Sequence, residues 1–145
     1  MSELFAPDST RDKVKKELEA IDAQFVQLTK AVSKERGSLA KKLDQMVSTE
    51  MADLGFNAAR FNAALIACNP GPHGAENIEF CVALNPGAPG GPLRKIASGG
   101  ELSRVALAIK KVLARSDALP TLVFDEIDAG IGGKTAEAVA ASLRA

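Results

Sequence analysis

The sequence predicts an α/β protein in which a long N-terminal coiled-coil helix precedes a lobe made of a β-hairpin and an αβα unit. Three observations support this fold class. Apolar residues recur at alternating intervals of four and three in the first third of the chain, as in coiled coils. Apolar and polar residues alternate around position 80, as in a half-buried strand. An apolar run then separates two helix-like segments near the C-terminus, which indicates a mixed α/β lobe.

The composition limits the size of the fold and its partners. A chain of 145 residues that is 46% hydrophobic is long enough for one domain with a substantial core. Because 18 basic residues balance 18 acidic ones, any contact with DNA has to come from a local patch or from parts outside this sequence. No apolar stretch approaches the roughly 20 residues that span a bilayer, and MSELFAPDST does not have the pattern of a signal peptide. We therefore expect a soluble, cytoplasmic protein without a membrane partner.

The cysteines predict the same compartment. Cys68 and Cys81 each lie in an apolar run with no second cysteine nearby. This pattern favours buried thiols over a metal site or a disulfide framework, and it suits a reducing cytoplasm.

The first segment is expected to be a leader over 1–10 and a coiled-coil arm over 11–54. The alternating spacing is carried by Val14, Leu18, Ile21, Phe25, Leu28 and Val32. Ser9, Thr10 and Asp12 can cap the start of the helix. The rhythm is interrupted at Glu35, Gly37 and Ser38, and we interpret its return at Leu39, Leu43 and Met46 or Val47 as a shift of phase. An amphipathic helix packed against its own domain is the alternative.

The residues from Gly55 onwards predict the lobe. Segments 61–68 and 78–84 are expected to pair as a hairpin, with NPGPHGAE at 69–76 as the turn and NPGAPGGP at 85–92 as a connector. His73, the only histidine of the chain, is expected to be solvated in that turn. Helices over 98–115 and from 134 onwards are expected to flank a strand at 121–125.

The GGKT sequence ending at Thr135 resembles the end of a phosphate-binding P-loop, but its spacing does not fit. A P-loop needs a glycine five positions before its second glycine, here Gly133, and that position is Asp128. With Asp125 and Glu126 close by, three carboxylates would repel a phosphate chain. We therefore expect a glycine-rich turn that caps a helix starting near Lys134.

The helix that starts near residue 98 carries the first candidate site. Ser98 and Glu101 have the spacing of a capping box. Gly99 and Gly100 each cost roughly 1 kcal/mol relative to alanine inside a helix, so they call for a reason. Without side chains they expose backbone N–H groups at the positive end of the helix dipole, where a phosphate can approach, with the Ser98 hydroxyl as a further donor. The alternative is a tight connection between loop and helix.

The second candidate site is the pair of acids in LVFDE. The apolar residues Leu122 to Phe124, followed by Asp125 and Glu126, predict a buried strand whose C-terminal end presents carboxylates, where open α/β sheets bind ligands. Asp125 could hold Mg²⁺ through its water shell. Glu126 could orient and polarise an attacking water. Ordinary surface acids are the alternative.

These two motifs, about 25 residues apart, resemble those of ABC-type ATPases. The sequence from Ala97 to Arg104, ASGGELSR, is similar to their signature motif, and LVFDE is similar to their Walker B strand. Together with the arm and the NPG turn of the hairpin, they resemble the bacterial double-strand-break repair ATPases related to SMC proteins over most of the chain. The resemblance implies the C-terminal lobe of an ABC-type ATPase head over 55–145.

The resemblance also implies partners and cofactors. An N-terminal Walker A lobe of the same protein, a second head in a homodimer, and DNA are the implied partners, and ATP and Mg²⁺ the implied cofactors. Ser98, Gly99, Gly100 and Glu101 would contact the ATP phosphate held by the partner head, whereas Asp125 would hold Mg²⁺ and Glu126 would be catalytic. This chain lacks Walker A and ends before the switch histidine of the family, so we expect a truncated lobe that is inactive alone. Gly132 stands where many ABC proteins have an aspartate, which puts the dimer contacts of that loop in doubt.

Two alternatives stay open from the sequence. SGGE and FDEID also fit other ATPases of the SMC or break-repair type, which the order of domains in the full gene would distinguish. The chain could instead be a non-enzymatic interaction module that uses 11–54 as a zipper, in which case nucleotide would not affect its association.

Overall fold

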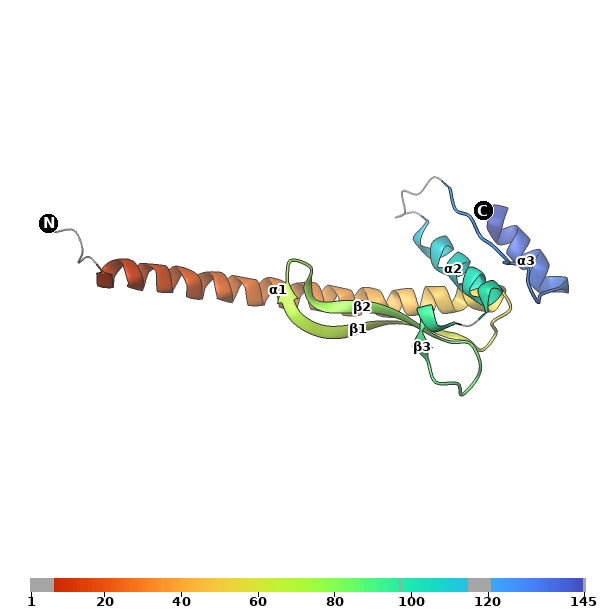
Figure 1. The fold of residues 1–145 in the computed structure, drawn as a ribbon, viewed down its shortest axis with the longest axis horizontal. Coiled ribbons are helices and arrows are strands. Elements are labelled where there is room, and N and C mark those ends of the chain that lie inside the picture. The colour runs from red at the N-terminus through yellow and green to blue at the C-terminus, as the bar shows by residue number, and fades with distance from the viewer. Residues whose placement is uncertain (1–6, 97, 115–120, 145) are drawn as a thin grey trace.

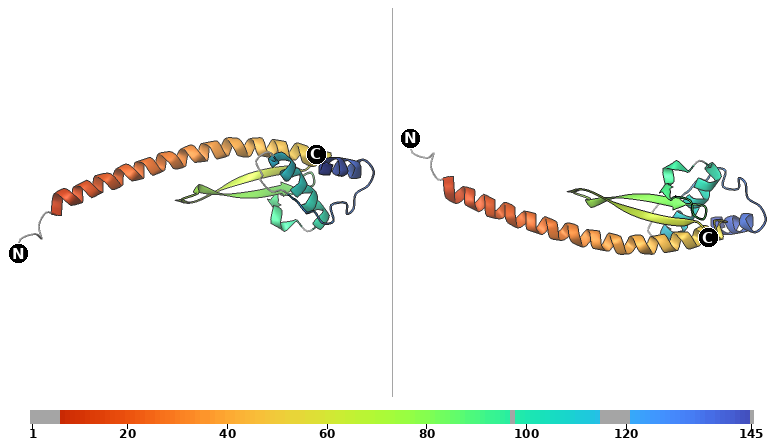
Figure 2. Two further views of the ribbon diagram at one scale, coloured as in Figure 1. Left: turned by 90° about the horizontal axis from the view of Figure 1, so that it is seen from above. Right: turned by 90° about the horizontal axis from the view of Figure 1, so that it is seen from below.

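The computed structural model describes residues 7–96, 98–114 and 121–144 of the chain. Figure 1 shows a long helix, α1, with a β-hairpin lying along its second half and two shorter helices near its C-terminal end. The two turned views in Figure 2 show the same neighbours. The predicted α/β fold class, a long helix followed by a lobe with a hairpin, is confirmed. Within the described ranges, no helix combines the length and the apolar character needed to cross a membrane.

Helix α1 spans Pro7–Asp53 and is 47 residues long, or about 70 Å. The predicted cap at Ser9 to Asp12 is wrong, because the backbone is already helical there. Proline is favoured in the first turn of a helix, since its missing N–H would have no intrahelical partner, and this explains a start at Pro7. Residues 1–6 of the predicted leader lie outside the described part of the chain.

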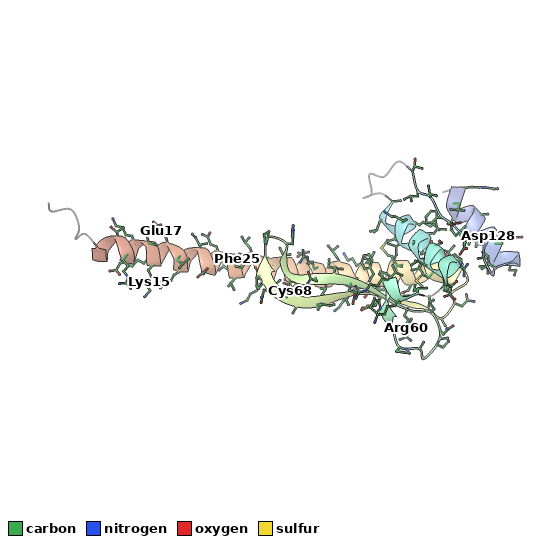
Figure 3. All side chains as sticks on the ribbon, in the orientation of Figure 1. Lys15, Glu17, Phe25, Arg60, Cys68 and Asp128 are labelled. Carbon is green, nitrogen blue, oxygen red and sulfur yellow. The ribbon has the colours of Figure 1, made fainter. Side chains whose placement is uncertain are left out.

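One side of α1 carries a continuous apolar stripe. At about 100° per residue, Leu39 and Met46 project on the same side as Val14 and Val32, so the expected shift of phase does not break the stripe. Its most exposed members have between 40% and 67% of their surface accessible: Val14, Leu18, Ile21, Phe25, Leu28, Val32, Leu39 and Met46. Figure 3 shows Lys15, Glu17 and Phe25 on the part of α1 that extends beyond the lobe. This stripe lacks a cover within the described chain.

The sheet has three antiparallel strands in the order β1, β2, β3. β1 (Arg60–Gly71) pairs with β2 (Gly74–Ala83), and Gly71 is opposite Gly74. The predicted eight-residue turn is therefore too long, because only Pro72 and His73 lie between the two strands. His73 is exposed as expected. A register irregularity between Ala67 and Gly71 accommodates Pro70, which has no N–H for a ladder. The expected connector also contains a short strand, β3 (Gly91–Pro92), which pairs with β2, followed by a 3-10 turn, η1 (Leu93–Lys95).

Helix α1 supplies hydrogen-bond acceptors to the outer edge of β1. The Asp44 carboxylate accepts from the backbone N–H of Ala63 at 2.6 Å, and the Ser48 hydroxyl accepts from that of Phe61 at 3.0 Å. The match is geometric: four residues of helix rise about 6 Å, close to the roughly 6.6 Å between alternate residues of a strand. Asp44 also accepts from the Asn62 amide at 3.1 Å. The edge of the sheet is thereby satisfied by a helix instead of another strand.

A second set of bonds ties the hairpin tip to α1. The Arg36 guanidinium donates to the His73 carbonyl at 2.6 Å and lies 3.3 Å from the Glu76 carboxylate, which also accepts from the Ser33 hydroxyl. Gly74 has φ +96°, and a Cβ there would stand 2.7 Å from the Arg36 side chain. A glycine at this position therefore allows both the turn and the arginine contact.

The core lies where the last turns of α1 meet the hairpin and helix α2 (Gly99–Leu113). Val47, Met51, Leu54 and Val105 are fully buried. Phe61 and Phe80 meet across the hairpin with ring centroids 5.2 Å apart. Helix α3 (Gly133–Arg144) contributes Val139. The second half of α1 is thus packed against the lobe. The alternative interpretation, an amphipathic helix packed against its own domain, applies to this half of α1. The division of the chain into arm and lobe at residue 54 remains a prediction.

Two other expectations differ from the structure. Residues 121–124 have no strand assignment, and Val123 is 91% exposed and Leu122 45% exposed. A parallel strand needs neighbours on its edges, and no described strand pairs with this segment. The thiols of Cys68 and Cys81 are free but only partly buried, because Cys81 alternates with the core-facing Phe80 and Val82 and Cys68 lies toward the hairpin tip. Arg115, the last residue of the predicted helix 98–115, lies outside the described residues.

The edge bonds of α1 give a first prediction. Asp44→Ala is expected to lower the free energy of unfolding by about 1 to 3 kcal/mol, because it leaves the N–H of buried Ala63 without a partner. Thr49→Ala is the control, since that exposed hydroxyl bonds only the Gln45 carbonyl of its own helix, and we expect a change below about 0.5 kcal/mol. Urea unfolding followed by circular dichroism measures both. Equal losses in the two variants would contradict the role assigned to Asp44.

Candidate functional site

The start of α2 is capped as the sequence predicts. Ser98 has extended backbone angles and its hydroxyl accepts from the N–H of Glu101 at 3.4 Å. A capping box also needs a bond from the Glu101 side chain to the backbone N–H of Ser98, and the described residues do not form it. Ser98 and Gly99 are exposed, whereas Gly100 is buried. The helix end is therefore open to solvent on one side and covered on the other. Ala97, the first residue of the motif, lies outside the described part.

A tight turn bearing the acids covers the buried side of this helix end. The N–H of Ala129 donates to the Glu126 carbonyl at 2.9 Å, and Glu126 has φ 54°. This left-handed conformation is unfavourable for a residue with a side chain, at about 1 kcal/mol or more, and such strain concentrates at functional sites. Asp125, Glu126 and Asp128 are all exposed. The turn thus presents its carboxylates outward.

Two side chains of α2 hold the turn in place. The Ser103 hydroxyl donates to the Asp125 carbonyl at 2.7 Å. The Arg104 guanidinium donates to the carbonyls of Ile127 and Ala129 at 3.3 and 3.0 Å. Arg104 is only 7% exposed and its guanidinium lies 5.2 Å from the centre of the Phe56 ring. These bonds bring the two sequence motifs, separated by more than 20 residues, into contact.

Sequence reasoning assigned no role to Ser103 or Arg104. The signal available for Arg104 was its position in α2, four residues after Gly100 and next to the apolar Val105, on the face that the helix buries. A buried arginine needs acceptors, and backbone carbonyls of a nearby turn can provide them.

The two glycines have a steric reason in this structure. A Cβ on Gly100 would stand 2.8 Å from the Glu126 carbonyl oxygen and 3.0 Å from the Cβ of Ala129. A Cβ on Gly99 would stand 2.6 Å from Oε2 of Glu126. The turn approaches the helix so closely that only glycine fits at position 100 without movement. These contacts support the alternative of a tight connection, whereas the anion site at the same backbone stays a prediction.

The carboxylate of Glu126 lies beside the N-terminal turn of α2. Negative charge is favourable there because the first N–H groups of a helix carry the positive end of its dipole. The structure thus places an anion where the sequence predicted a phosphate. Among the described residues, no group of three or more His, Cys, Asp or Glu side chains could hold a metal ion. The role of Asp125 in holding Mg²⁺ through its water shell stays a prediction.

The GGKT segment leads into a helix that begins one residue before the expected start at Lys134. Gly133 has φ +55° and begins α3, and Lys134 is exposed. Thr135 packs against the turn that follows α1, where a Cβ on Gly55 would stand 2.7 Å from Cγ2 of Thr135. The segment thus fastens α3 to the α1–β1 connection.

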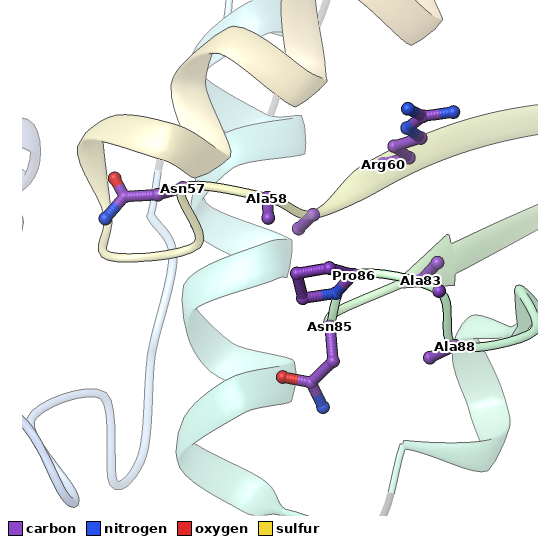
Figure 4. A pocket seen from close by; sticks show the side chains of 9 residues that line it. Asn57, Ala58, Arg60, Ala83, Asn85, Pro86 and Ala88 are labelled. Carbon is purple, nitrogen blue, oxygen red and sulfur yellow. The ribbon is translucent and has the colours of Figure 1, made fainter.

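Two hollows lie next to the site. The first, of about 490 Å³, has Glu101, Arg104 and Gly132 in its lining, together with Thr135 and the loops that flank the hairpin. The second, of about 590 Å³, lies between the loop before β1 and the loop after β2, and Figure 4 shows Asn57, Asn85 and Pro86 at its edge. Of the six residues predicted to form the ATP site, only Glu101 lines the first hollow. Gly132, in the loop after the acids, also lines it. Neither asparagine was assigned a functional role from the sequence, although Asn85 begins the NPGAPGGP connector.

Comparison with known proteins shows one consistent similarity. The whole of this chain aligns with the DNA repair protein RecN of Treponema pallidum at 38% identity. In the same way, 99% of this chain aligns with the DNA repair protein RecN of Vibrio cholerae at 36% identity. This chain resembles the C-terminal part of RecN. The RecN of Xylella fastidiosa is 60% identical over 76 residues, which are 52% of this chain. No family model matches the chain. It spans about a quarter of the length of the first two RecN relatives, 26% in each case.

The close approach at this RecN-like motif gives a second prediction. Gly100→Ala is expected to lower the free energy of unfolding by about 1 kcal/mol or more, because its Cβ would push the acidic turn away. Gly37→Ala is the matched control: that Cβ would meet nothing within 4 Å, so replacing a helical glycine should stabilise the protein by about 0.4 to 1 kcal/mol. Urea unfolding measures both values. A stabilising Gly100→Ala would show that the turn does not pack on α2 in solution.

Proposed function

We propose that this chain supplies the signature motif and the Walker B acids of an ATP-hydrolysing head in a RecN-like protein of DNA double-strand-break repair. The observation that carries the proposal is the joining of SGGE and FDE at one point by Ser103 and Arg104. The relatives named DNA repair protein RecN support it. An SMC-type or other break-repair ATPase head is the nearest alternative within the same chemistry.

The exposed segment 121–124 supports the proposal of a second lobe. Val123 is an apolar residue with 91% of its surface exposed. In a complete α/β sheet such residues are buried, because helices cover both faces of the strands. We propose that an N-terminal Walker A lobe supplies neighbouring strands, so that 121–125 becomes the Walker B strand. Asp125 and Glu126 would then follow its C-terminal end, where α/β sheets bind ligands.

In this head each candidate residue has a distinct role. Glu126 would accept a proton from the attacking water, and Asp125 would hold Mg²⁺ through its water shell. The metal would neutralise charge on the phosphates of ATP. Ser98, Gly99, Gly100 and Glu101 would contact the phosphate of an ATP bound by a second head, since the N–H groups of a helix start favour anions.

Such a dimer requires a rearrangement at the start of α2. The Glu126 carboxylate lies beside Gly99, so a phosphate arriving there would meet a like charge. Strand formation at 121–125 would reposition the turn and vacate the helix end. The left-handed φ of Glu126 is consistent with a turn that has another preferred conformation.

The apolar stripe of α1 suggests a further partner within the same protein. Apolar side chains at intervals of four and three pack against a second helix in coiled coils. We propose that this second helix is the antiparallel arm of the same polypeptide. The stripe also supports a second candidate function, a non-enzymatic coiled-coil module. The two differ in whether ATP changes the association of the protein, which sedimentation with and without nucleotide would measure.

The roles of the acids give a third prediction, made for a protein that includes the Walker A lobe. Glu126→Gln is expected to leave ATP binding intact and to slow hydrolysis by a factor of about 100 or more, because a general base contributes 10² to 10⁴. Lys134→Ala should have little effect, since Lys134 lies at an exposed helix start. The present chain alone is the negative control and should neither bind MgATP tightly nor hydrolyse it. Loss of binding in Lys134→Ala with full activity in Glu126→Gln would reverse both assignments.

Sharing of sites between two heads gives a fourth prediction. Gly100→Asp and Glu126→Gln homodimers should both be inactive, the first because a carboxylate occupies the phosphate position. Each site combines the signature motif of one head with the acids of the other. In a dimer of one Gly100→Asp head and one Glu126→Gln head, one site therefore carries both changes and the other site carries neither. ATPase rates on mixing should therefore recover to roughly a quarter of wild type, if the sites act independently. Crosslinking verifies that mixed dimers form. Mixed dimers without single-turnover hydrolysis would count against the shared site.

A further inference from the structure

A face of α1 that lies next to the hairpin side and opposite the apolar stripe carries a group of lysines that form no ion pair among the described residues. Lys30, Lys34 and Lys41 are exposed and project within about 40° of one another around the helix axis. Gly37 lies between them, and nothing stands within 4 Å of where its Cβ would be. The surface is hollowed at this point, in a shallow groove lined by Ser33, Lys34, Gly37, Ser38, Lys41 and Lys42. We call Lys30, Lys34, Gly37 and Lys41 the basic face.

The charge around the basic face is strongly one-sided although the chain as a whole is neutral. Residues 23–43 contain five basic residues and one acid, Glu35. Arg36 is engaged with Glu76, and no described carboxylate forms an ion pair with Lys30, Lys34 or Lys41. By contrast, residues 11–22 of the same helix contain four basic and four acidic residues. The positive potential is therefore local to the middle of α1.

The other sides of α1 at this level already have assigned contacts. Ala40 packs against the core, about 100° around the helix from Lys41, and Arg36 and Asp44 bind the hairpin. Leu39 belongs to the apolar stripe, about 160° from Lys41. A partner on the basic face would displace neither the hairpin nor a helix on the stripe.

We propose that the basic face binds the phosphate backbone of double-stranded DNA. Lysines act as point charges that contact phosphates without reading bases, and the three span about 16 Å along a rigid helix. DNA presents one negative charge per roughly 1.7 Å of its axis, so several phosphates lie within that length. No aromatic residue occurs in 30–42, so the face has no platform for stacking unpaired bases, which favours a duplex over a single strand. Gly37 lets a phosphate approach the helix backbone.

The choice of DNA among polyanions rests on the proposed function in DNA repair. The test uses this chain without nucleotide, so its result does not depend on Glu126, on Ser98 or on a second head. Failure of DNA binding would leave ATP hydrolysis in the longer protein untouched, and failure of hydrolysis would leave this test unaffected.

The first experiment removes charge. Fluorescence anisotropy follows binding to a labelled duplex of about 30 base pairs between about 50 and 200 mM salt. The variant Lys30→Gln, Lys34→Gln, Lys41→Gln should bind at least about ten-fold more weakly at the lowest salt and lower the slope of log K against log salt by about 2.7. The matched control is Lys13→Gln, Lys15→Gln, Lys16→Gln, which removes the same charge from the balanced part of α1 and should change affinity by less than about two-fold. Equal losses in the two variants, or no duplex binding by the unaltered chain, would overturn the proposal.

The second experiment keeps the charge and fills the hollow. Gly37→Leu should weaken duplex binding several-fold while the helix content by circular dichroism is retained, because leucine is a better helix former than glycine. Ala23→Leu is the control, since that exposed position projects on the same side of α1 but lies before the lysines. Vesicles of phosphatidylglycerol and a single strand of the same sequence complete the test. Binding to either with equal strength and equal sensitivity to the lysine changes would show a general polyanion surface and overturn the assignment to duplex DNA.

Discussion

The backbone N–H groups on the outer edge of strand β1 need hydrogen-bond acceptors, and helix α1 supplies them. The arrangement of the rest of the lobe depends on this contact. A two-stranded hairpin is marginally stable alone. Asp44 and Ser48, one helical turn apart, accept from the N–H groups of Ala63 and Phe61. This contact lays the inner face of the hairpin against Val47 and Met51 and creates the surface on which α2 packs. The long helix, part of which is the predicted arm, is therefore one wall of the lobe.

The position of α2 in turn fixes the candidate site. An ion pair between Lys111 and Glu50, at 2.6 Å, joins its C-terminal half to α1, while Arg104 near its start reaches under the acidic turn. Bare backbone at Gly99 and Gly100 allows the turn to approach. The same feature that makes the helix end suitable for an anion also lets Glu126 cover it. Access to the helix end then depends on the conformation of residues 121–131, which strands from another lobe would alter.

The three sides of α1 divide its possible partners. The side with Asp44 holds the hairpin, the stripe from Val14 to Met46 suits a second helix, and the basic face suits phosphates. These surfaces lie on different sides of one helix, with the apolar stripe opposite the basic face. Under the proposed function, this helix of 47 residues would connect the ATP-binding lobe to DNA.

The sequence by itself determined the elements whose causes are local. Periodicity gave α1 and the hairpin, and Ser98 and Gly133 marked the starts of α2 and α3, because caps and apolar spacing act within a few residues. Only the tertiary structure decided what depends on distant neighbours: the length of the hairpin turn, the partly exposed thiols, the roles of Ser103 and Arg104, and the second half of α1 as core. Residues 121–124 show the difference most clearly. Their composition predicts a buried strand, but a strand exists only when another strand pairs with it, and none of the described strands does.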